Sequence, residues 1–251
     1  MHRFDYDLKT AAAPRLGLIV LQSDERIETD FRRLIPDSAE LFVSRIPSGL
    51  DVTPETLSAM EAHLPASAAL LPQAGAFDVI GYGSTSGAAQ IGPSEVAAQV
   101  RSGAGTGAVT EPVSALIAAC HALGLRRLAF LSPYVADVSE RLRTVLAGQG
   151  IDTPVFGSFE EAEEARVARF TPASIMAAGA QLVSTGGVDG LFLSCTNLDT
   201  LDIIAPLEAE TGLPVLSSNL VLGWHMCQLA GLAAADLPAM ANLARTCRIP
   251  A

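Results

Sequence analysis

The stretch Gly186-Gly-Val-Asp-Gly-Leu-Phe-Leu-Ser-Cys-Thr-Asn-Leu-Asp-Thr200 gives the clearest indication of the fold of this 251-residue chain. Residues 188–193 form a short apolar run, typical of a strand buried inside a parallel sheet. The run leads into small and polar residues, Cys195 among them. In open α/β sheets, ligands bind at the carboxyl ends of the strands. Cys195 is therefore a candidate functional residue, although free cysteine is also a common core residue.

A second stretch, Ala76-Phe-Asp-Val-Ile-Gly-Tyr-Gly-Ser-Thr-Ser-Gly87, has the same pattern. Its Ser84 stands where the first stretch has Cys195, 111 residues later in the chain. An apolar strand also precedes each stretch at nearly the same distance, over 15–21 and 127–131. This repeat is too long for a solenoid. It predicts two related α/β halves whose polar strand ends face one cleft.

We therefore predict an α/β protein with two flavodoxin-like domains related by a pseudo-twofold axis. Each domain has a mostly parallel four-stranded sheet, and the active site lies in the interdomain cleft. Residues 14–117 plus 220–251 form the first domain, and residues 118–219 form the second. Predicted strands are 16–21, 41–46, 77–82, 108–109, 128–131, 154–156, 188–193 and 213–216. Predicted helices include 25–34, 94–100, 113–123, 135–146, 172–185, 202–210, 221–232 and 238–244. The charged segment 160–169 is interpreted as a solvated surface.

Composition narrows the classes of function. A net charge of −11 disfavours binding to nucleic acid, whose phosphates would repel the chain. No apolar run is long enough to cross a bilayer, and residues 1–9 lack the apolar region of a secretory signal. The four cysteines show no zinc-type spacing, so we expect free thiols, a reducing cytoplasm and no metal site. Homo-oligomerisation stays open.

The predicted strand ends carry hydroxyl, amide and thiol groups that suit a carboxylate ligand. They are Ser23-Asp24, Ser84-Thr85-Ser86, Ser132 to Tyr134, Cys195-Thr196-Asn197 and Ser217-Ser218-Asn219. Neutral donors at such positions can hold a carboxylate. A helix start expected near Cys195 would favour the thiolate, so we expect a lowered thiol pKa. That thiolate could move a proton at carbon or add to an activated double bond.

These motifs resemble the aspartate/glutamate racemase superfamily, in particular its maleate cis–trans isomerase and arylmalonate decarboxylase branch. The resemblance runs from about residue 16 to residue 232. Ser-Cys-Thr-Asn-Leu over 194–198 is similar to the second cysteine motif of the superfamily, and 78–82 is similar to the strand before the first cysteine. Here Ser84 replaces that first cysteine. Family members have two α/β domains with one cysteine position in each, facing across the cleft.

The resemblance implies a role for each candidate residue. Cys195 is the catalytic thiol and Ser84 takes the partner position, while Thr85, Ser86 and Tyr134 match groups that bind a carboxylate in the decarboxylases. Further predicted substrate-binding residues are Thr196, Asn197, Asp24, Ser23 and Asn219. Asp24 stands where maleate isomerases have a carboxylate-binding asparagine, which would imply an amino or other donor group on the substrate. The nearest resemblance, to the A protein of bacterial ectoine-utilisation clusters, would fit an amino-acid-like substrate.

The predicted function is that of a cofactor-independent isomerase or racemase acting on a small carboxylate or amino-acid-like substrate through a cysteine thiolate, with ectoine catabolism as a candidate context. Two alternatives stay open. One is a decarboxylase in which Cys195 alone donates a proton to an enediolate. The other is a non-catalytic carboxylate-binding protein that has lost the first thiol.

Overall fold

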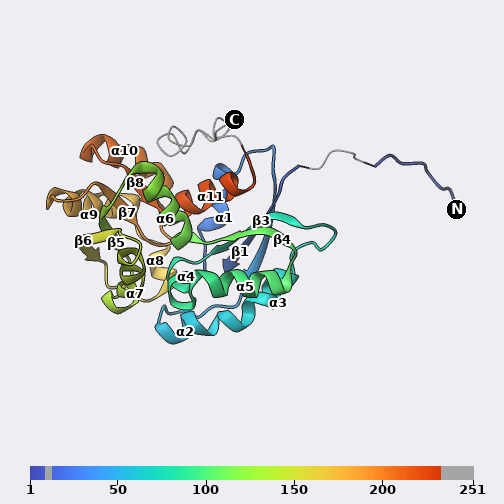
Figure 1. Cartoon of the computed structure of the whole chain (residues 1–251), viewed down its shortest axis with the longest axis horizontal. Helices are drawn as coiled ribbons and strands as arrows, with labels where there is room; N and C mark the ends of the chain where they lie inside the picture. The colour runs from blue at the N-terminus through green and yellow to red at the C-terminus, as the bar shows by residue number, and fades with distance from the viewer. Residues whose placement is uncertain (9–12, 233–251) are drawn as a thin grey trace.

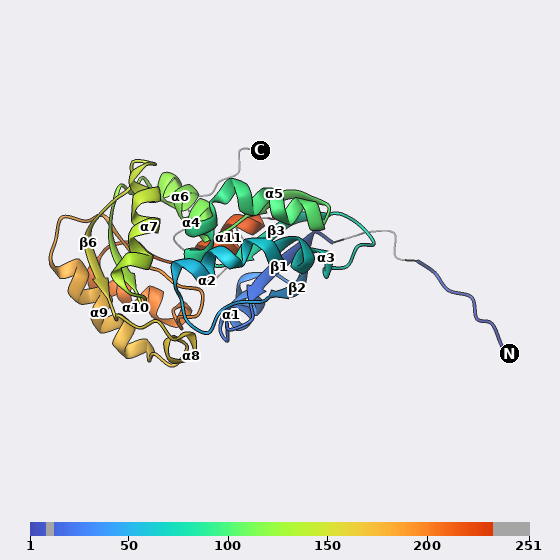
Figure 2. The ribbon, with the colours of Figure 1, turned by 90° about the horizontal axis from the view of Figure 1, so that it is seen from below.

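The protein has two α/β lobes, as a computed structural model describes them for residues 1–8 and 13–232 (Figure 1). Each lobe contains a four-stranded sheet, with strand orders β2-β1-β3-β4 and β6-β5-β7-β8. All neighbouring strands are parallel. The two lobes lie side by side along the long axis of the molecule (Figure 2). The predicted α/β fold with two related parallel sheets is confirmed.

The first lobe is built from residues near the start of the chain. Its strands are β1 (Arg15–Leu21), β2 (Glu40–Ile46), β3 (Phe77–Gly83) and β4 (Thr106–Thr110). Its helices are α1 (Ile27–Leu34), α2 (Pro54–Ala59), the 3₁₀ turn η1 (Glu61–His63), α3 (Leu64–Ala69), α4 (Thr85–Ile91), α5 (Pro93–Gly103) and α6 (Pro112–Leu123). The central strands β1 and β3 are almost wholly buried, which explains their continuous apolar runs.

The second lobe repeats this plan. Its strands are β5 (Arg127–Ser132), β6 (Asp152–Ser158), β7 (Gly190–Leu193) and β8 (Val215–Ser217). Its helices are α7 (Ala136–Ala147), α8 (Glu164–Val167), α9 (Pro172–Ser184) and α10 (Leu201–Thr211), and α11 (Ser218–Leu229) follows β8. The same kind of hydrogen bond occurs at the start of the equivalent strand in each lobe. Asp78 accepts the N–H of Arg15 at the start of β1, and Asp189 accepts those of Arg126 and Arg127 at the start of β5.

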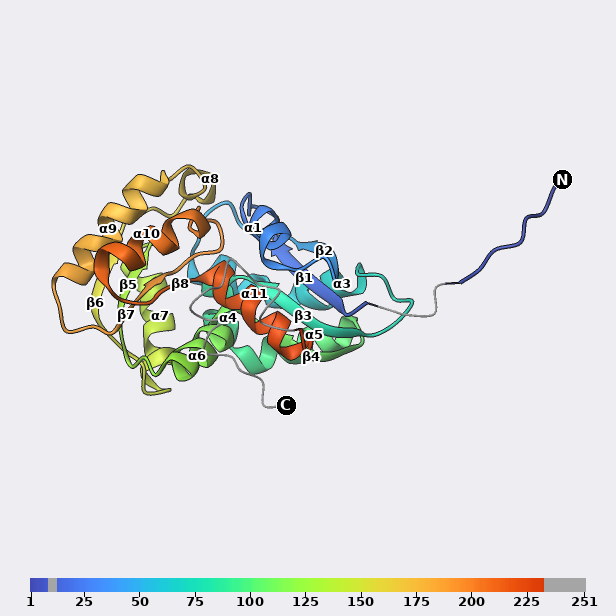
Figure 3. The ribbon, with the colours of Figure 1, turned by 90° about the horizontal axis from the view of Figure 1, so that it is seen from above.

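Helix α11 leaves the second sheet and packs on the first lobe, against α1, α6 and β3 (Figure 3). A side chain on Gly81 of β3 would collide with Met226, because a Cβ there would lie 2.5 Å from the sulfur. The glycine therefore allows helix and sheet to approach closely. This packing supports our proposal that residues 220–232, the described part of the segment assigned to the first domain, belong with that domain. The helix predicted over 238–244 lies outside the described residues.

The segment before α2 also joins the lobes. Asp51 and Glu163 form an isolated antiparallel bridge. Beside it, the N–H of Val52 donates to the carbonyl of Ala162, and the N–H of Glu164 donates to that of Leu50. Two loops 110 residues apart therefore meet over the junction between the sheets.

Two helices differ from the sequence prediction. One short helix was expected in 83–107, but the structure has α4 and α5, separated at Gly92, whose φ of 100° interrupts the helical path. Helix α1 begins at Ile27 rather than near residue 25, and in the turn before it the Asp24 carboxylate accepts the N–H groups of Arg26 and Ile27. No helix in the described part of the chain is long and apolar enough to cross a membrane.

Candidate active site

Cys195 lies just beyond the carboxyl end of β7 and is 3% exposed. Its Sγ is 2.9 Å from the hydroxyl of Tyr134 and accepts the N–H of Asn197 at 3.2 Å. Its own N–H donates to Ser218 Oγ at 3.1 Å. Helix α10 begins only at Leu201, so Cys195 is not at a helix N-terminus. The thiol is instead fixed within a turn by hydrogen bonds.

The expected lowering of the Cys195 pKa is wrong for the unliganded protein. Burial raises the pKa of this thiol well above its usual value, and the charge of nearby Glu164 raises it further. The hydrogen bonds from Tyr134 and Asn197 oppose that increase without cancelling it. Burial therefore favours the neutral form of the Cys195 thiol.

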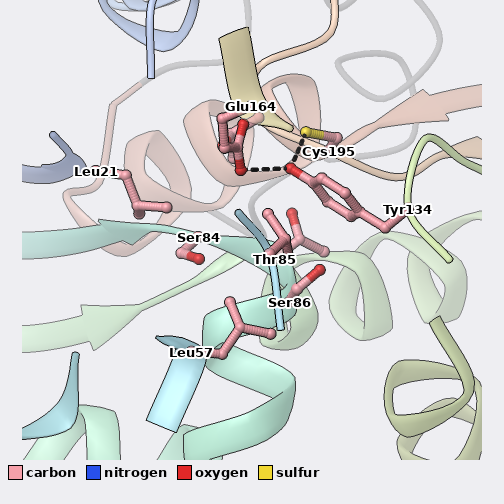
Figure 4. A pocket seen from close by; sticks show the side chains of 10 residues that line it. Leu21, Leu57, Ser84, Thr85, Ser86, Tyr134, Glu164 and Cys195 are labelled. Atoms are coloured by element: carbon pink, nitrogen blue, oxygen red, sulfur yellow. Dashed lines mark hydrogen bonds between the residues drawn. The ribbon is translucent and has the colours of Figure 1, made fainter. Parts of the chain in front are cut away.

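Tyr134 connects the thiol to a carboxyl group. It lies in the turn between β5 and α7, and its hydroxyl donates to Glu164 Oε1 at 2.7 Å. In the 2.9 Å contact between Cys195 Sγ and the Tyr134 hydroxyl, either atom can be the donor, so the single proton of that hydroxyl can be directed to Glu164 or to the sulfur. In Figure 4, dashed lines join the Tyr134 hydroxyl to both Glu164 and Cys195.

Glu164 is the site residue that the sequence analysis missed, since segment 160–169 was interpreted as solvated surface. Glu164 is the first residue of α8 and is 4% exposed. Its Oε2 accepts a hydrogen bond from Asn197 Nδ2 at 2.8 Å. Burial raises the pKa of Glu164, against the lowering effect of its bonds from Asn197 and Tyr134.

The opposite wall comes from the first lobe. Ser84 caps α4, accepting the N–H of Gly87 through Oγ at 3.1 Å. Thr85 donates its hydroxyl proton to Ser218 Oγ at 2.8 Å, so Ser218 connects this wall to the N–H of Cys195. Ser86 lies beside them (Figure 4). Each lobe therefore supplies one wall of the site.

Between these walls lies a small cavity. It is lined by Leu21, Val52, Leu57, Ser84, Thr85, Ser86, Tyr134, Glu164, Cys195 and Thr196. Its open space is about 10 Å³, enough for roughly one water molecule. An organic substrate therefore requires the walls to separate or the side chains to rotate.

Four of the predicted binding residues surround the cavity without lining it. Asn197 lies behind the thiol, and its Oδ1 accepts the N–H of Glu25 at 2.9 Å. Asp24 accepts the N–H groups of Arg26 and Ile27 in the turn before α1, and Ser23 is hydrogen-bonded to Ser48. Asn219 donates to Asp30 and to the carbonyl of Thr196, both at 2.8 Å. These four residues therefore support the lining from outside.

No group of three or more His, Cys, Asp and Glu side chains within residues 1–8 and 13–232 is arranged to hold a metal ion. The chemistry available in the described cavity is that of a thiol, several hydroxyls and a carboxyl group.

The family model for arylmalonate decarboxylase matches residues 16–243. The chain belongs to this family. It is 30% identical to the arylmalonate decarboxylase of Bordetella bronchiseptica, over 94% of this chain and 98% of the relative. It is 29% identical to the maleate isomerase of Nocardia farcinica, over 81% of this chain and 85% of the relative.

Solved structures of both kinds of enzyme share the fold. A cysteine-to-serine variant of the N. farcinica maleate cis–trans isomerase, which carries a covalently bound succinylcysteine intermediate, matches with a TM-score of 0.81 at 26% identity, covering 94% of this chain and all of the other. A liganded double variant of arylmalonate decarboxylase matches with a TM-score of 0.76 at 27% identity, covering 87% and 93%. Cysteine-based enzymes are therefore the structural relatives of this family member.

Proposed function

We propose that the chain is a cofactor-independent isomerase or racemase that acts on a small carboxylate or amino-acid-like substrate through Cys195. The supporting observation is the position of Cys195, which among the described residues is the one thiol that lines the cavity and which faces a wall of hydroxyl groups across a site buried between the two lobes. The relatives named for maleate isomerase, one with a covalent succinylcysteine, support a reacting cysteine. In this proposal Cys195 is the catalytic residue and Ser84 occupies the partner position.

Two hydrogen bonds suit the sulfur to chemistry in which it becomes negative. The N–H of Asn197 already points to Sγ, and the hydroxyl of Tyr134 can rotate from Glu164 toward it. Both bonds strengthen as charge develops on sulfur. A thiolate formed here could add to a carbon–carbon double bond, giving an S–C bond and placing the electron pair on the carbon next to the carboxylate. Rotation and loss of the thiolate would then complete an isomerisation.

The same site could exchange a proton at the carbon next to a carboxylate. Removal of that proton by the Cys195 thiolate would leave an enediolate, whose two oxygens need hydrogen-bond donors. Thr85 and Ser86 are placed to provide them, with Thr196 at the end of the Cys195 strand. Thr85 now donates to Ser218, so it must redirect its proton to the substrate. Cys195 would return the proton from one face, opposite Ser84.

A decarboxylase is the second candidate, because burial favours the neutral thiol, which can donate a proton. Loss of carbon dioxide from a malonate-type substrate would give the same enediolate, and Cys195 would protonate it at carbon. The family relative named arylmalonate decarboxylase supports this reaction class. The cavity of about 10 Å³ must open for a malonate of any size, whether or not it carries an aryl ring.

The test is proton NMR in deuterium oxide with wild-type protein and Cys195→Ala. Substrates are maleate, methylmalonate, and both enantiomers of alanine and aspartate. Formation of fumarate or solvent exchange at carbon supports an isomerase or racemase, while monocarboxylate formation with release of carbon dioxide supports a decarboxylase. Activity that survives in Cys195→Ala would contradict the thiol mechanism. Binding without any conversion or exchange would favour a carboxylate-binding protein.

A further inference from the structure

Glu164 places a carboxyl group without a cationic partner beside the thiol. The arginines of its own segment pair elsewhere, Arg166 with Glu161 and Arg169 with Glu25, both at 2.8 Å. Among the described residues, no salt bridge reaches Glu164. A buried carboxylate is costly unless it is paired, so an unpaired one in a cavity indicates a ligand with a complementary group.

The carboxyl group also has unused capacity to accept hydrogen bonds. A carboxylate offers about four lone-pair sites. Tyr134 and Asn197 occupy two of them, one on each oxygen. Because Glu164 itself lines the cavity, a bound molecule can approach the remaining sites.

A second carboxyl group reinforces the negative potential. The charge of Asp24 lies close enough to raise the pKa of both Glu164 and Cys195. Asp24 accepts N–H groups in the turn before α1 and does not line the cavity, so the complementary role that the sequence suggested for it falls to Glu164. A substrate carboxylate placed at this wall would meet two acids, whereas an ammonium group would be attracted by both.

The two walls of the cavity therefore favour ligand groups of opposite charge. Figure 4 shows Glu164 and Cys195 on one side, and Ser84, Thr85 and Ser86 on the other. The hydroxyl wall carries no acid and can donate to a carboxylate, while the Glu164 wall accepts hydrogen bonds and attracts cations.

We propose that Glu164 is the specificity-determining residue of the site: it binds the protonated amino group of an amino carboxylate, and it excludes dicarboxylates. This inference rests on the proposed function for the hydroxyl wall, where Thr85 and Ser86 hold the carboxylate. The carbon chain between the two charged groups then lies beside Cys195. The site thus accepts a zwitterion in a fixed direction.

The experiment compares matched ligands by isothermal titration calorimetry. Glycine, β-alanine and 4-aminobutanoate form one series, and malonate, succinate and glutarate form the other, so that each pair differs by an ammonium group in place of a carboxylate. For the best-fitting pair, we expect wild-type protein to bind the amino member at least about 10-fold more tightly. An ion-pair preference of this size is within the range of charge-assisted hydrogen bonds.

Glu164→Gln removes the charge and keeps an amide that can accept from Asn197 and donate to Tyr134. We expect it to reduce the amino-over-carboxylate preference at least about 10-fold. Glu163→Gln is the matched control, because it removes the same charge from the exposed neighbouring side chain and should keep the wild-type preference. Circular dichroism and the thermal midpoint check folding, and the wild-type comparison does not depend on either variant.

The possible results separate the two proposals. Tighter binding of the dicarboxylates by wild-type protein, or an unchanged preference in folded Glu164→Gln, would overturn the role of Glu164 and leave the carboxylate site intact. Binding of neither series would remove the hydroxyl-wall site, and with it the inference that rests on it.

Discussion

Asn197 and Glu164 are joined by a 2.8 Å hydrogen bond from the amide Nδ2 to Oε2. The backbone N–H of the same asparagine donates to Cys195 Sγ, and its Oδ1 accepts the N–H of Glu25. One residue therefore fixes the acid relative to the thiol and ties both to the turn after β1. This arrangement keeps the sulfur and the carboxyl group close together. Burial is the main reason why the pKa of the Cys195 thiol is raised, and the nearby charge of Glu164 adds to it.

The first prediction concerns the reactivity of Cys195 in the free protein. Because burial and the Glu164 charge raise its thiol pKa, and only the thiolate is nucleophilic, we expect slow alkylation by iodoacetamide at pH 7. The rate should rise about tenfold per pH unit up to pH 9 as the thiolate fraction grows. Mass spectrometry of alkylated peptides measures each cysteine separately.

Cys120 and Cys227 are internal controls for this measurement, since burial raises the pKa of each to about 12. At pH 7, Cys195 should react no more than a few times faster than these two thiols. A rate for Cys195 that levels off below pH 8 would show that its thiolate is already formed, and would restore the expectation of a lowered pKa.

The second prediction concerns the hydroxyl of Tyr134. Tyr134→Phe leaves Glu164 Oε1 without its donor and removes a bond from the sulfur, so we expect the free energy of unfolding to fall by about 1–3 kcal/mol. If the hydroxyl also stabilises charge in the transition state, kcat/KM should fall at least about tenfold, since a charge-assisted bond contributes roughly 1.5–3 kcal/mol. Chemical denaturation and steady-state kinetics measure the two effects.

Tyr82→Phe is the comparison variant, because Tyr82 is also buried but does not line the cavity; its hydroxyl contacts Met60 Sδ at 3.6 Å and interacts with Ser84. It should keep nearly wild-type kcat/KM. Equal losses of activity in both variants would mean that Tyr134 acts through folding alone.

The repeat in the sequence predicted the fold because the fold depends on short sequence patterns that can be recognised locally. The apolar runs, the polar strand ends and the equivalent Asp78 and Asp189 recur at one spacing, and each follows from contacts near the start or end of a strand. The same spacing brought Ser84 and Cys195 to one cavity. Helix α4 was missed because its sequence is rich in glycine, alanine and serine, and its start depends on the Ser84 cap.

Glu164 could not be predicted in the same way. Its burial depends on the pairing of the loop at 50–52 with residues 162–164, a contact between segments 110 residues apart. Within its own segment, Glu160, Glu161 and Glu163 are chemically identical neighbours. Only the position of Tyr134 and Asn197 distinguishes the buried glutamate from the exposed ones.

The third prediction concerns Asp30, which lies behind the Cys195 turn and bonds to Asn219 and Arg26. Burial raises the pKa of Asp30 from 3.8 to about 6. A raised carboxyl pKa means that the folded state binds the Asp30 proton more tightly than the unfolded state does. The stabilisation that this proton gives to the folded state is therefore complete below about pH 4 and is lost as pH rises through about 6. This loss should amount to as much as about 3 kcal/mol of unfolding free energy.

The measurement is urea unfolding at pH 4 and pH 7 for wild type and Asp30→Asn. Other buried acids also make the free energy of unfolding fall as pH rises. We therefore compare how much that free energy falls between pH 4 and pH 7 in wild type and in Asp30→Asn. Asp30→Asn should lose less stability than wild type between these pH values, while the exposed control Asp37→Asn should behave as wild type. Identical pH dependence in Asp30→Asn and wild type would show that Asp30 is already ionised at pH 4.

The last prediction concerns Ser84, the counterpart of Cys195 in the first half of the chain. Both residues line one cavity, and each follows the equivalent strand of its sheet. An unassisted serine hydroxyl is a poor acid or base near neutrality, whereas an unperturbed cysteine has a pKa near 8.5. We expect Ser84→Cys to gain proton exchange from the second face, seen as solvent deuterium entering both enantiomers of a small carboxylate substrate.

The substitution has a structural cost that can be measured separately. Ser84 Oγ caps α4 by accepting the N–H of Gly87, and loss of a serine cap costs about 1 kcal/mol. Ser84→Ala provides the control, because it should lose the same cap without gaining a thiol. Ser84→Cys combined with Cys195→Ala should lose two-sided exchange, since only one acid/base group would remain. If folded Ser84→Cys exchanges no faster than Ser84→Ala at either enantiomer, the two positions do not flank one substrate carbon, and the second half of the proposed symmetric site is wrong.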